Sequence, residues 1–359
     1  MKKYIWVLLT AMAFGTMEIA LKIGGNAFST IQLTSLRFLI GGLFLLPFAL
    51  LDLKKRHARA LTEKSGQDCQ EKIGENPKKE GFPHPKGSDG RHPGKTNIFQ
   101  TVIGRREIGY ILLLSFVNIV VSMTLFQLSV MTSNATLAAV LISFNPMFTM
   151  VFAHFIAGER FTLHKLGVLI VCMSGLILVA APWNLAEGNS AIGILIGLGA
   201  SLTFGLYTAI SKRCVGRIGG MSLNSFSFLI GGVLLAVTAL LLGNPEKCAA
   251  GPGGLTSICW MPFHLSDMVQ GITRRTLPTL MYVSLVVTGF GYFCFMRAVE
   301  RVGASAASYA FFVKPVIAML LAAAILGEPI TWNIVTGILL ILAGCIYNVS
   351  KNTNKSAIK

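Results

Sequence analysis

Ten apolar runs of roughly 18–24 residues divide this chain, and each is long enough to cross a ~30 Å hydrocarbon core as an α-helix. Only 13% of the 359 residues are charged, whereas a soluble protein carries about 25%. The sequence therefore predicts an all-α polytopic membrane protein with ten transmembrane helices. Their approximate spans are 4–23, 32–52, 108–130, 134–157, 163–181, 191–211, 222–242, 276–296, 303–326 and 331–349.

A five-residue segment, FLIGG, occurs twice in the chain, at Phe38–Gly42 and at Phe228–Gly232, an offset of 190 positions. A second block matches at an offset of 169, with GERFT at Gly158–Thr162 and GEPIT at Gly327–Thr331. These matches indicate two diverged copies of one unit. Further pairs at the first offset are Phe14 with Phe204, Lys22 with Lys212, and Ser35 with Ser225.

The repeat and the apolar runs divide the chain in the same way. Five runs fall in a first unit, residues 1–181, and five in a second unit, residues 191–350, followed by a tail at 351–359. Two polar stretches follow the second and the seventh run, an insert of 55 residues at 53–107 and a loop of 33 residues at 243–275. Their difference of 22 residues agrees with the 21 positions by which the two offsets differ. We therefore expect two five-helix repeats.

Lysine and arginine near the ends of membrane helices mark the cytoplasmic side. This rule places both termini in the cytoplasm, because the short loops on the opposite side contain neither residue. An odd number of helices inverts the second unit, and the charges agree: GERFTLHK carries Arg160 and Lys165, whereas GEPITWNI carries neither. Inverted repeats of this kind are typical of secondary transporters. We expect a multi-pass protein of the cell (inner) membrane.

The insert 53–107 holds 13 Lys and Arg against 7 Asp and Glu. It lacks the apolar residues that a core needs, so we expect it to be disordered and cytoplasmic. Nucleic-acid binding is disfavoured because the charges are interleaved with Pro and Gly and accompanied by two aromatic residues only, Phe82 and Phe99. We interpret His84 and His92 as part of a solvated linker rather than as a metal site.

Two further features leave alternatives open. Cys248 and Cys259 lie in the predicted outer loop and form a disulfide if that side of the membrane is oxidising. The start of the chain, MKKYIWVLLTAMAFG, also resembles a secretory signal peptide with a cleavage site at Ala11–Ala13. The repeat disfavours this interpretation, because cleavage would remove most of the helix that matches 191–211.

Polar residues inside membrane spans are costly and mark candidate functional sites. Lys314 and Asn145 occupy matching positions in the ninth and fourth runs, each directly before a proline, Pro315 and Pro146. Each proline removes one backbone hydrogen bond, so we predict a break or kink in both helices. We predict that both side chains face a central cavity, where Lys314 binds a substrate carboxylate or phosphate or exchanges a proton. The alternative is a kink for packing, with Lys314 paired to a structural acid.

A second polar group, Glu18, Lys22 and Arg37, lies in the outer parts of the first two runs. Glu18 and Lys22 are four positions apart and so share a helix face. Glu18 is either a proton carrier for coupling, if burial favours its protonated form, or a fixed counter-ion of Arg37 or Lys22. Further polar candidates, for substrate binding or for hydrogen bonds between helices, are Asn118, Gln127, His154 and Tyr207.

Small residues recur every four positions along the sixth run, at Gly193, Gly197, Ser201 and Gly205. A stripe of this kind lets a neighbouring helix approach closely. It serves either packing inside the bundle or a homodimer face, and the sequence leaves both open.

Several segments carry a resemblance over nearly the whole chain, apart from the insert 53–107 and much of 243–275. They are FGTMEIALK, LRFLIGG, NATLAAVLISFNPMFTMVFAHFIAGERFT and its echo GASAASYAFFVKPVIAMLLAAAILGEPIT. With these segments the chain resembles the EamA-type members of the drug/metabolite transporter superfamily. The resemblance implies an inner-membrane exporter or exchanger of amino acids, other metabolites or drugs. It also implies a central cavity lined by both halves and no ATP hydrolysis.

We therefore expect a secondary transporter of a small organic metabolite, such as an amino acid or another anionic or zwitterionic solute, working by alternating access. An anionic or zwitterionic solute is favoured because the charge of Lys314 repels cations. The alternative is a membrane scaffold or receptor that recruits a partner through the insert 53–107. The sequence contains no GxSxG, HExxH, CxxC or Walker motif, so we expect no enzyme activity, no metal and no cofactor. Its expected partners are the solute and the lipid bilayer, with no nucleic acid.

Overall fold

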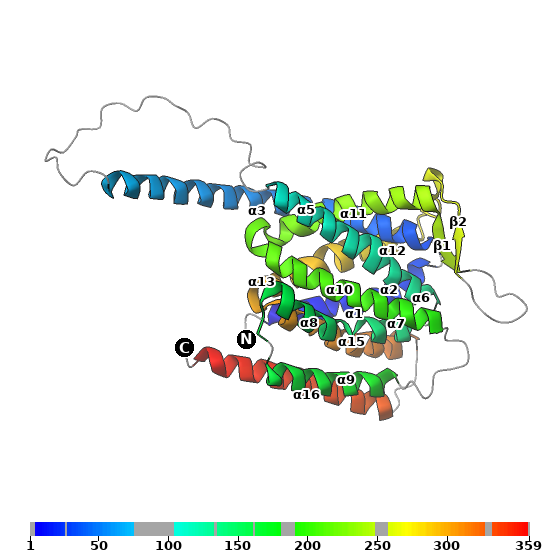
Figure 1. Cartoon of the computed structure of the whole chain (residues 1–359). Helices are drawn as coiled ribbons and strands as arrows, with labels where there is room; N and C mark the ends of the chain where they lie inside the picture. Colours follow the sequence, from blue (N-terminus) through cyan, green and yellow to red (C-terminus); the bar gives the residue numbers. More distant parts are fainter. Residues whose placement is uncertain are drawn as a thin grey trace, which may run out of the picture.

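A computed structural model describes residues 4–25, 27–74, 104–132, 135–160, 162–180, 191–247, 258–326 and 332–357. These residues form a bundle of helices with one small antiparallel sheet at one end (Figure 1). Helix α1 begins and helix α16 ends at the opposite end (Figure 1). We call the end with these two helix ends the terminal face, and the end with the sheet the hairpin face.

The first half of the chain forms nine helical segments within the described residues. They are α1 (Ile5–Gly15), α2 (Met17–Gly25), α3 (Thr30–Gly74), α5 (Arg105–Ser115), the π-helical segment η1 (Phe116–Met123), α6 (Thr124–Thr132), α7 (Ala135–Ile142), α8 (Asn145–Ala157) and α9 (Leu163–Ala180).

The second half opens with two long helices and then the sheet. The elements are α10 (Ala191–Ile218), α11 (Gly220–Leu242), β1 (Asn244–Lys247), β2 (Ile258–Met261), the 3-10 helix η3 (Leu265–Met268), α12 (Leu277–Met281), the π-helical segment η4 (Tyr282–Gly291), α13 (Tyr292–Val302), α14 (Ala304–Ala307), α15 (Ala310–Leu326) and α16 (Trp332–Ala357).

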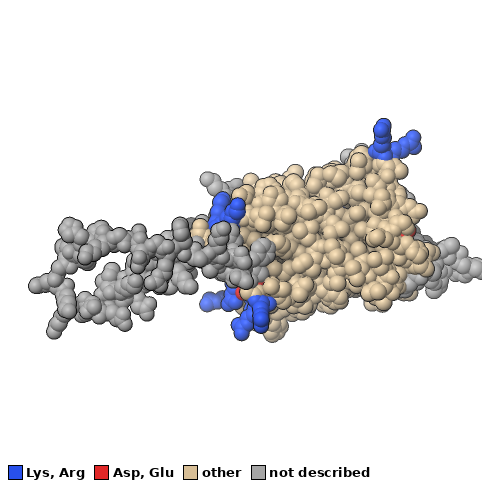
Figure 2. Space-filling model, turned by 90° about the horizontal axis from the view of Figure 1, so that it is seen from above, with Lys and Arg blue, Asp and Glu red and all other residues tan. Residues whose placement is uncertain are grey.

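Six helical stretches of the described chain are long and apolar enough to cross a membrane. They are Thr30–Ala58, Arg105–Thr132, Val140–Ala157, Ile192–Ile218, Gly220–Leu242 and Leu277–Val302. Four shorter apolar helices accompany them, at Ile5–Leu21, Leu163–Leu178, Ala304–Ile317 and Val335–Gly344. Figure 2 shows Lys and Arg only near the two ends of one face, with other residues covering the middle. The chain is a helical membrane protein.

The insert after the second apolar run differs from the prediction. Helix α3 continues through Gly74, so residues 53–74 are helical rather than disordered. The sequence of this extension explains the difference, because it is rich in Leu, Lys, Arg, Ala, Glu and Gln, which favour helix even without a core. Residues 75–103 lie outside the described residues.

The loop 243–275 also contains structure that the all-α prediction did not include. Strands β1 and β2 pair antiparallel, with Glu246 opposite Cys259. The side-chain amide of Gln32, near the start of α3, donates to the carbonyls of Met268 and Gln270 and ties the end of this loop to the bundle. Cys248 and the side chain of Cys259 lie outside the described residues, so the disulfide stays a prediction.

The two FLIGG segments pack against each other where α3 meets α11. The rings of Phe38 and Phe228 meet edge to face with their centroids 4.8 Å apart. Two hydrogen bonds flank them: the Ser35 hydroxyl donates to the Gly232 carbonyl at 2.7 Å, and the Ser225 hydroxyl donates to the Gly42 carbonyl at 3.0 Å. A Cβ atom on Gly232 would lie 2.8 Å from Leu39 Cγ, so glycine permits this close approach.

The small-residue stripe of α10 packs inside the bundle. A Cβ atom on Gly205 would lie 2.9 Å from the backbone nitrogen of Thr149 on α8, and one on Gly197 would lie 3.0 Å from Leu141 Cβ on α7. The Ser201 hydroxyl donates to the Ile142 carbonyl at 3.4 Å. This carbonyl is the one freed by Pro146, so α10 supplies the hydrogen bond that the proline removes.

The two prolines affect their helices differently. Helix α7 ends at Ile142 and α8 begins at Asn145 with Pro146 in its first turn, so the first half has the predicted break. Pro315 instead lies inside α15, and the interruption comes earlier, between Ala307 and Ala310. Helix α15 therefore has no break at Pro315, because it continues through the loss of one hydrogen bond, and a kink at this position stays a prediction.

Candidate functional site

Lys314 lies at the centre of the bundle and is 0% exposed. Its ammonium nitrogen is 5.1 Å from the centroid of the Phe126 ring on α6 and 5.8 Å from that of Phe311 on its own helix. Aromatic faces attract a cation, and the attraction is strongest where water is excluded. Lys314 is thus a buried cation held between a helix of the first half and a helix of the second half.

Asn145 occupies the matching position in the first half and is also 0% exposed. Its Oδ1 accepts a hydrogen bond from the Thr149 hydroxyl, one turn along α8. Its Nδ2 donates no hydrogen bond within the part of the chain that the structure describes. The amide of Asn145 therefore keeps a donor for another group.

Arg37 is a second buried cation, 1% exposed, on the hairpin-face half of the membrane span of α3. Its guanidinium carbon lies 5.0 Å from the centroid of the Phe38 ring. It also lies close enough to Tyr292 to interact electrostatically. Its Nε and Nη2 have no hydrogen-bond partner among the described residues. The structure thus places Arg37 in the core, and its predicted ion pair with Glu18 stays a prediction because the Glu18 side chain lies outside the described residues.

Two side-chain amides near the core are likewise without hydrogen bonds in the described part of the chain. Asn118 on η1 lies close enough to Tyr292 for their side chains to interact and is 0% exposed, but neither of its amide atoms makes a well-formed hydrogen bond in these residues. The same holds for Gln127 on α6. Buried polar groups are normally paired, so unpaired ones indicate a place for a polar ligand or for water. No three His, Cys, Asp or Glu gather within the described residues.

Tyr207, a predicted substrate ligand, already has a partner in the bundle. Its hydroxyl donates to Asn224 Oδ1 at 2.9 Å, and Asn224 Nδ2 donates to the Tyr292 carbonyl at 3.2 Å. Tyr207 therefore links α10 to α11 and α13. A role in substrate binding stays a prediction for this residue.

Aromatic rings fill the bundle beside these polar groups. Phe14 and Tyr292 have centroids 5.1 Å apart, and Phe204 and Phe311 have centroids 5.2 Å apart. The four residues come from α1, α13, α10 and α15, and all are buried. Edge-to-face contacts of this kind stabilise a packed core. The polar groups therefore lie in a low-dielectric surrounding.

The remaining group of predicted site residues is described only in part. Glu18 and Lys22 both lie on α2, so the helix that places them on one face is present. Their side chains lie outside the described residues. A coupling role for Glu18 stays a prediction.

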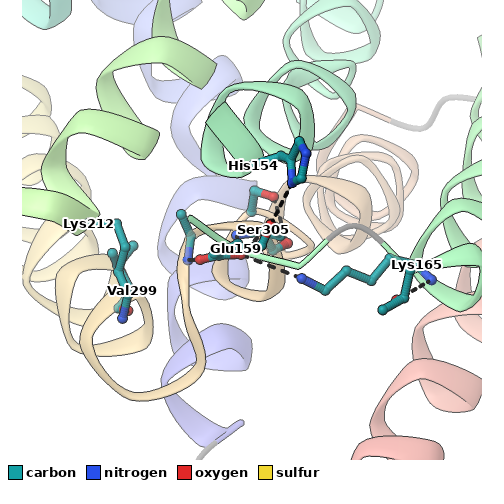
Figure 3. Close-up of polar contacts among 9 residues, drawn as sticks. His154, Glu159, Lys165, Lys212, Val299 and Ser305 are labelled. Atoms are coloured by element: carbon teal, nitrogen blue, oxygen red, sulfur yellow. Dashed lines mark hydrogen bonds and ion pairs between the residues drawn. The ribbon is translucent and has the colours of Figure 1, made fainter. Parts of the chain in front are cut away.

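Glu159 makes a contact at the terminal face that sequence reasoning missed. Its carboxylate accepts hydrogen bonds from the backbone nitrogens of Ala304 at 2.6 Å and Ser305 at 3.3 Å, and from the Ser305 hydroxyl (Figure 3). Lys165 completes the group with its nitrogen 3.5 Å from the carboxylate. Glu159 thus caps the start of α14, where the helix dipole favours negative charge. The only hint in the sequence is the repeated Gly-Glu pair.

Two other predicted polar residues lie at the same face. His154 is exposed, and its Nδ1 lies 3.0 Å from the backbone carbonyl oxygen of Glu159 (Figure 3). Lys212 donates to the carbonyls of Val299 at 2.9 Å and Glu300 at 3.4 Å, in the last turn of α13. Both residues therefore belong to loop and helix-end contacts rather than to the buried site.

Comparison with known families identifies the group to which this sequence belongs. The sequence model of the EamA-like transporter family matches residues 1–62, 94–181 and 191–350. The chain belongs to the EamA-like transporter family. The match leaves out much of the insert, in agreement with the resemblance noted from the motifs.

Individual relatives agree with this assignment. A protein of Clostridium kluyveri, named an uncharacterized transporter, is 29% identical over 364 residues, which cover 100% of this chain and 96% of that protein. A protein of Salmonella typhimurium, named a probable amino-acid metabolite efflux pump, is 25% identical over 219 residues, or 60% of this chain and 67% of that protein. A solved crystal structure has the same fold, with a TM-score of 0.63 at 13% identity over 97% of this chain and 96% of its own.

Proposed function

We propose that this protein is a secondary transporter that moves a small carboxylate-bearing metabolite, such as an amino acid, by alternating access. Family membership supports transport. The Salmonella relative, named a probable amino-acid metabolite efflux pump, supports the amino-acid class. The single observation that carries the solute class is Lys314, fully buried between the two halves, because a buried positive charge attracts anionic groups and repels cations.

The proposal includes ten spans arranged as two inverted repeats, 1–181 and 191–350. Contacts that recur when the two halves are interchanged support this arrangement. A Cβ atom on Gly15 would lie 2.7 Å from Ile317, and one on Gly205 would lie 2.8 Å from Phe148, which is the residue that matches Ile317 at the offset of 169. Equivalent glycines thus meet equivalent partners across the two halves.

Packing of whole helices supports the same symmetry. Helix α1 packs on α15 and α10 on α8, while α3 packs on α11 and α9 on α16. Each pairing joins a helix of one half to a helix of the other, as in transporters whose halves rock against each other. The charge distribution of the sequence then makes the terminal face cytoplasmic, with both termini inside the cell.

The test is a comparison of metabolites in cells and medium for cells that express the wild type, Lys314→Ala, Lys54→Ala or no protein. Lys54 is exposed on α3, so Lys54→Ala removes a cation outside the bundle and serves as the matched control. We expect the wild type and Lys54→Ala to move the same acids across the membrane, and Lys314→Ala, expressed at the same level, to move at least tenfold less, roughly the loss of one charge-assisted hydrogen bond. A wild type that moves no solute contradicts the proposal.

A further inference from the structure

The two unpaired nitrogens of Arg37 form one edge of its guanidinium group. Nε–H and the nearer N–H of Nη2 point in the same direction, as two parallel donors of a planar fork. Both nitrogens are buried, and neither has a hydrogen-bond partner among the described residues. Arg37 therefore places a complete pair of donors in the core, and no described residue accepts a hydrogen bond from it.

A carboxylate is the group that this fork fits best. Its two oxygens accept the two parallel hydrogen bonds at once, and such bidentate pairs are among the strongest hydrogen bonds in proteins. Phosphate oxygens also match this geometry. A lysine presents a point charge instead and cannot reproduce the paired contact.

The surroundings of Arg37 fix the orientation of the fork. The guanidinium group lies over the Phe38 ring, and the ring of Phe38 meets that of Tyr292 with centroids 5.9 Å apart. Tyr292 in turn lies beside Asn118, whose amide has no hydrogen bond in the described residues. Three membrane spans therefore place one cation and one amide around the same tyrosine.

The backbone at two of these positions is unusual. Asn118 lies within the π-helical segment η1, and Tyr292 directly follows the π-helical segment η4. Such segments appear frequently at functional sites, where they alter the direction of side chains. Both halves of the chain carry one in their third span.

A buried guanidinium edge with no partner among the described residues is costly, so these donors need a role that offsets the cost. Lys314 differs, because aromatic rings already surround its ammonium group. We propose that Arg37 binds the carboxylate of the transported solute through Nε and Nη2, with Asn118 contacting a second polar group of that solute. This assignment rests on the proposed function and deepens it.

Arg37 is 1% exposed, so the site is closed to solvent in this conformation. The solute carboxylate reaches the fork when the two halves separate. Arg37 thus binds the carboxylate through paired hydrogen bonds, and Lys314 adds positive charge to the interior of the bundle.

Thermal unfolding of purified protein tests the assignment. The probes are the twenty protein amino acids and the matching amino-acid amides, in which a carboxamide replaces the α-carboxylate. The variants are Arg37→Gln and Arg37→Lys, with Arg297→Gln as the control. Arg297 also carries a guanidinium group, but it pairs with Glu300 at 3.1 Å, away from the site.

We expect at least one amino acid to stabilise the wild type and Arg297→Gln, while its amide does not. Arg37→Gln should bind that acid about a hundredfold more weakly, the loss of a charged hydrogen-bond pair. Arg37→Lys should lose about tenfold and keep part of the preference for the acid. If Arg37→Gln fails to fold, Arg37→Lys carries the test.

The inference is overturned if no acid is preferred over its amide by the wild type, or if Arg37→Gln and Arg37→Lys keep the full preference. Either result leaves transport itself intact when the wild type still moves a solute in the cell experiment. Failure of the proposed function looks different, because the wild type then moves nothing.

Discussion

Arg37 and Lys314 are both fully buried cations, yet their surroundings differ. The ammonium group of Lys314 lies over Phe126 and Phe311, whereas two nitrogens of Arg37 have no hydrogen-bond partner in the described residues. A cation that protein groups already surround changes the electrostatic potential of a site. A cation with an unused pair of donors binds a specific group. We therefore infer that Lys314, in the second half, attracts anionic solutes and that Arg37, in the first half, binds their carboxylate.

The helices that carry the two cations are also anchored differently. Helix α3 is tied to α11 by hydrogen bonds on both sides of Arg37, from Ser35 to Gly232 and from Ser225 to Gly42. The segment that leads to Lys314 is held at the terminal face by Glu159. Arg37 thus lies on a helix that is hydrogen-bonded to its neighbour on both sides of this residue. The segment before Lys314 is held by the Glu159 cap at one end only.

The largest effect separates the two cations directly. Arg37→Met should lower the transport of an acid about a hundredfold and remove the preference for the acid over its amide, because the fork is lost. Lys314→Met should lower transport about tenfold and keep that preference. Uptake into vesicles containing the purified variants measures both quantities. Equal loss of preference in the two variants would remove the distinction.

A smaller effect concerns the packing behind Lys314. Gly15→Ala places a Cβ atom 2.7 Å from Ile317 on the same helix as Lys314, so α1 and α15 must separate. Overpacking of this kind costs about 1–3 kcal/mol, and the apparent Tm should fall. Gly109→Ala is the control, because nothing lies within 4 Å of that site and its Tm should rise slightly. An unchanged Tm for Gly15→Ala would show that this contact is loose.

The cap at the terminal face gives the next effect. Glu159→Gln removes the charge that accepts the Ala304 and Ser305 hydrogen bonds, and should destabilise the protein by about 1–2 kcal/mol. Glu107→Gln removes a carboxylate 3.8 Å from Arg217, whose side chain is 73% exposed, and should cost less than about 0.5 kcal/mol. Thermal unfolding of the two variants side by side measures the difference. Equal shifts would mean that the cap contributes no more than a surface pair.

The smallest effect tests the anchor beside Arg37. Ser35→Ala removes the 2.7 Å hydrogen bond to the Gly232 carbonyl and should cost about 1 kcal/mol. Ser174→Ala removes an exposed hydroxyl that bonds within its own helix, and its Tm should stay the same. Ser35→Ala should also weaken acid binding slightly, because α3 carries Arg37. Stronger binding in this variant would argue against a fixed α3–α11 pair.

The sequence predicted the parts of this account that depend on repetition and hydropathy. The two FLIGG segments indicated a repeated unit, and the structure packs them on each other. Pro146 predicted the break before α8, since a proline fits the first turn of a helix. Pro315 did not mark a break, because the interruption of this span lies between Ala307 and Ala310.

The sequence could not predict contacts that depend on distant partners. Glu159 and Ala304 are 145 positions apart, so only the folded chain shows that one caps the other. Arg37 was visible as a cation in a span, but which of its nitrogens lack a partner among the described residues depends on how other helices pack around it. The extension of α3 through Gly74 reflects local helix propensity, which outweighs the lack of apolar residues there.

The most direct test of the central claim is the Nε–H signal of Arg37 in an NMR spectrum of protein with isotope-labelled arginine, assigned by its absence in Arg37→Lys. Addition of a transported amino acid should move this signal downfield, as a hydrogen bond to a carboxylate requires, and its amide should leave the signal in place. A signal that does not move while transport of the acid continues would show that Arg37 is not the carboxylate-binding residue.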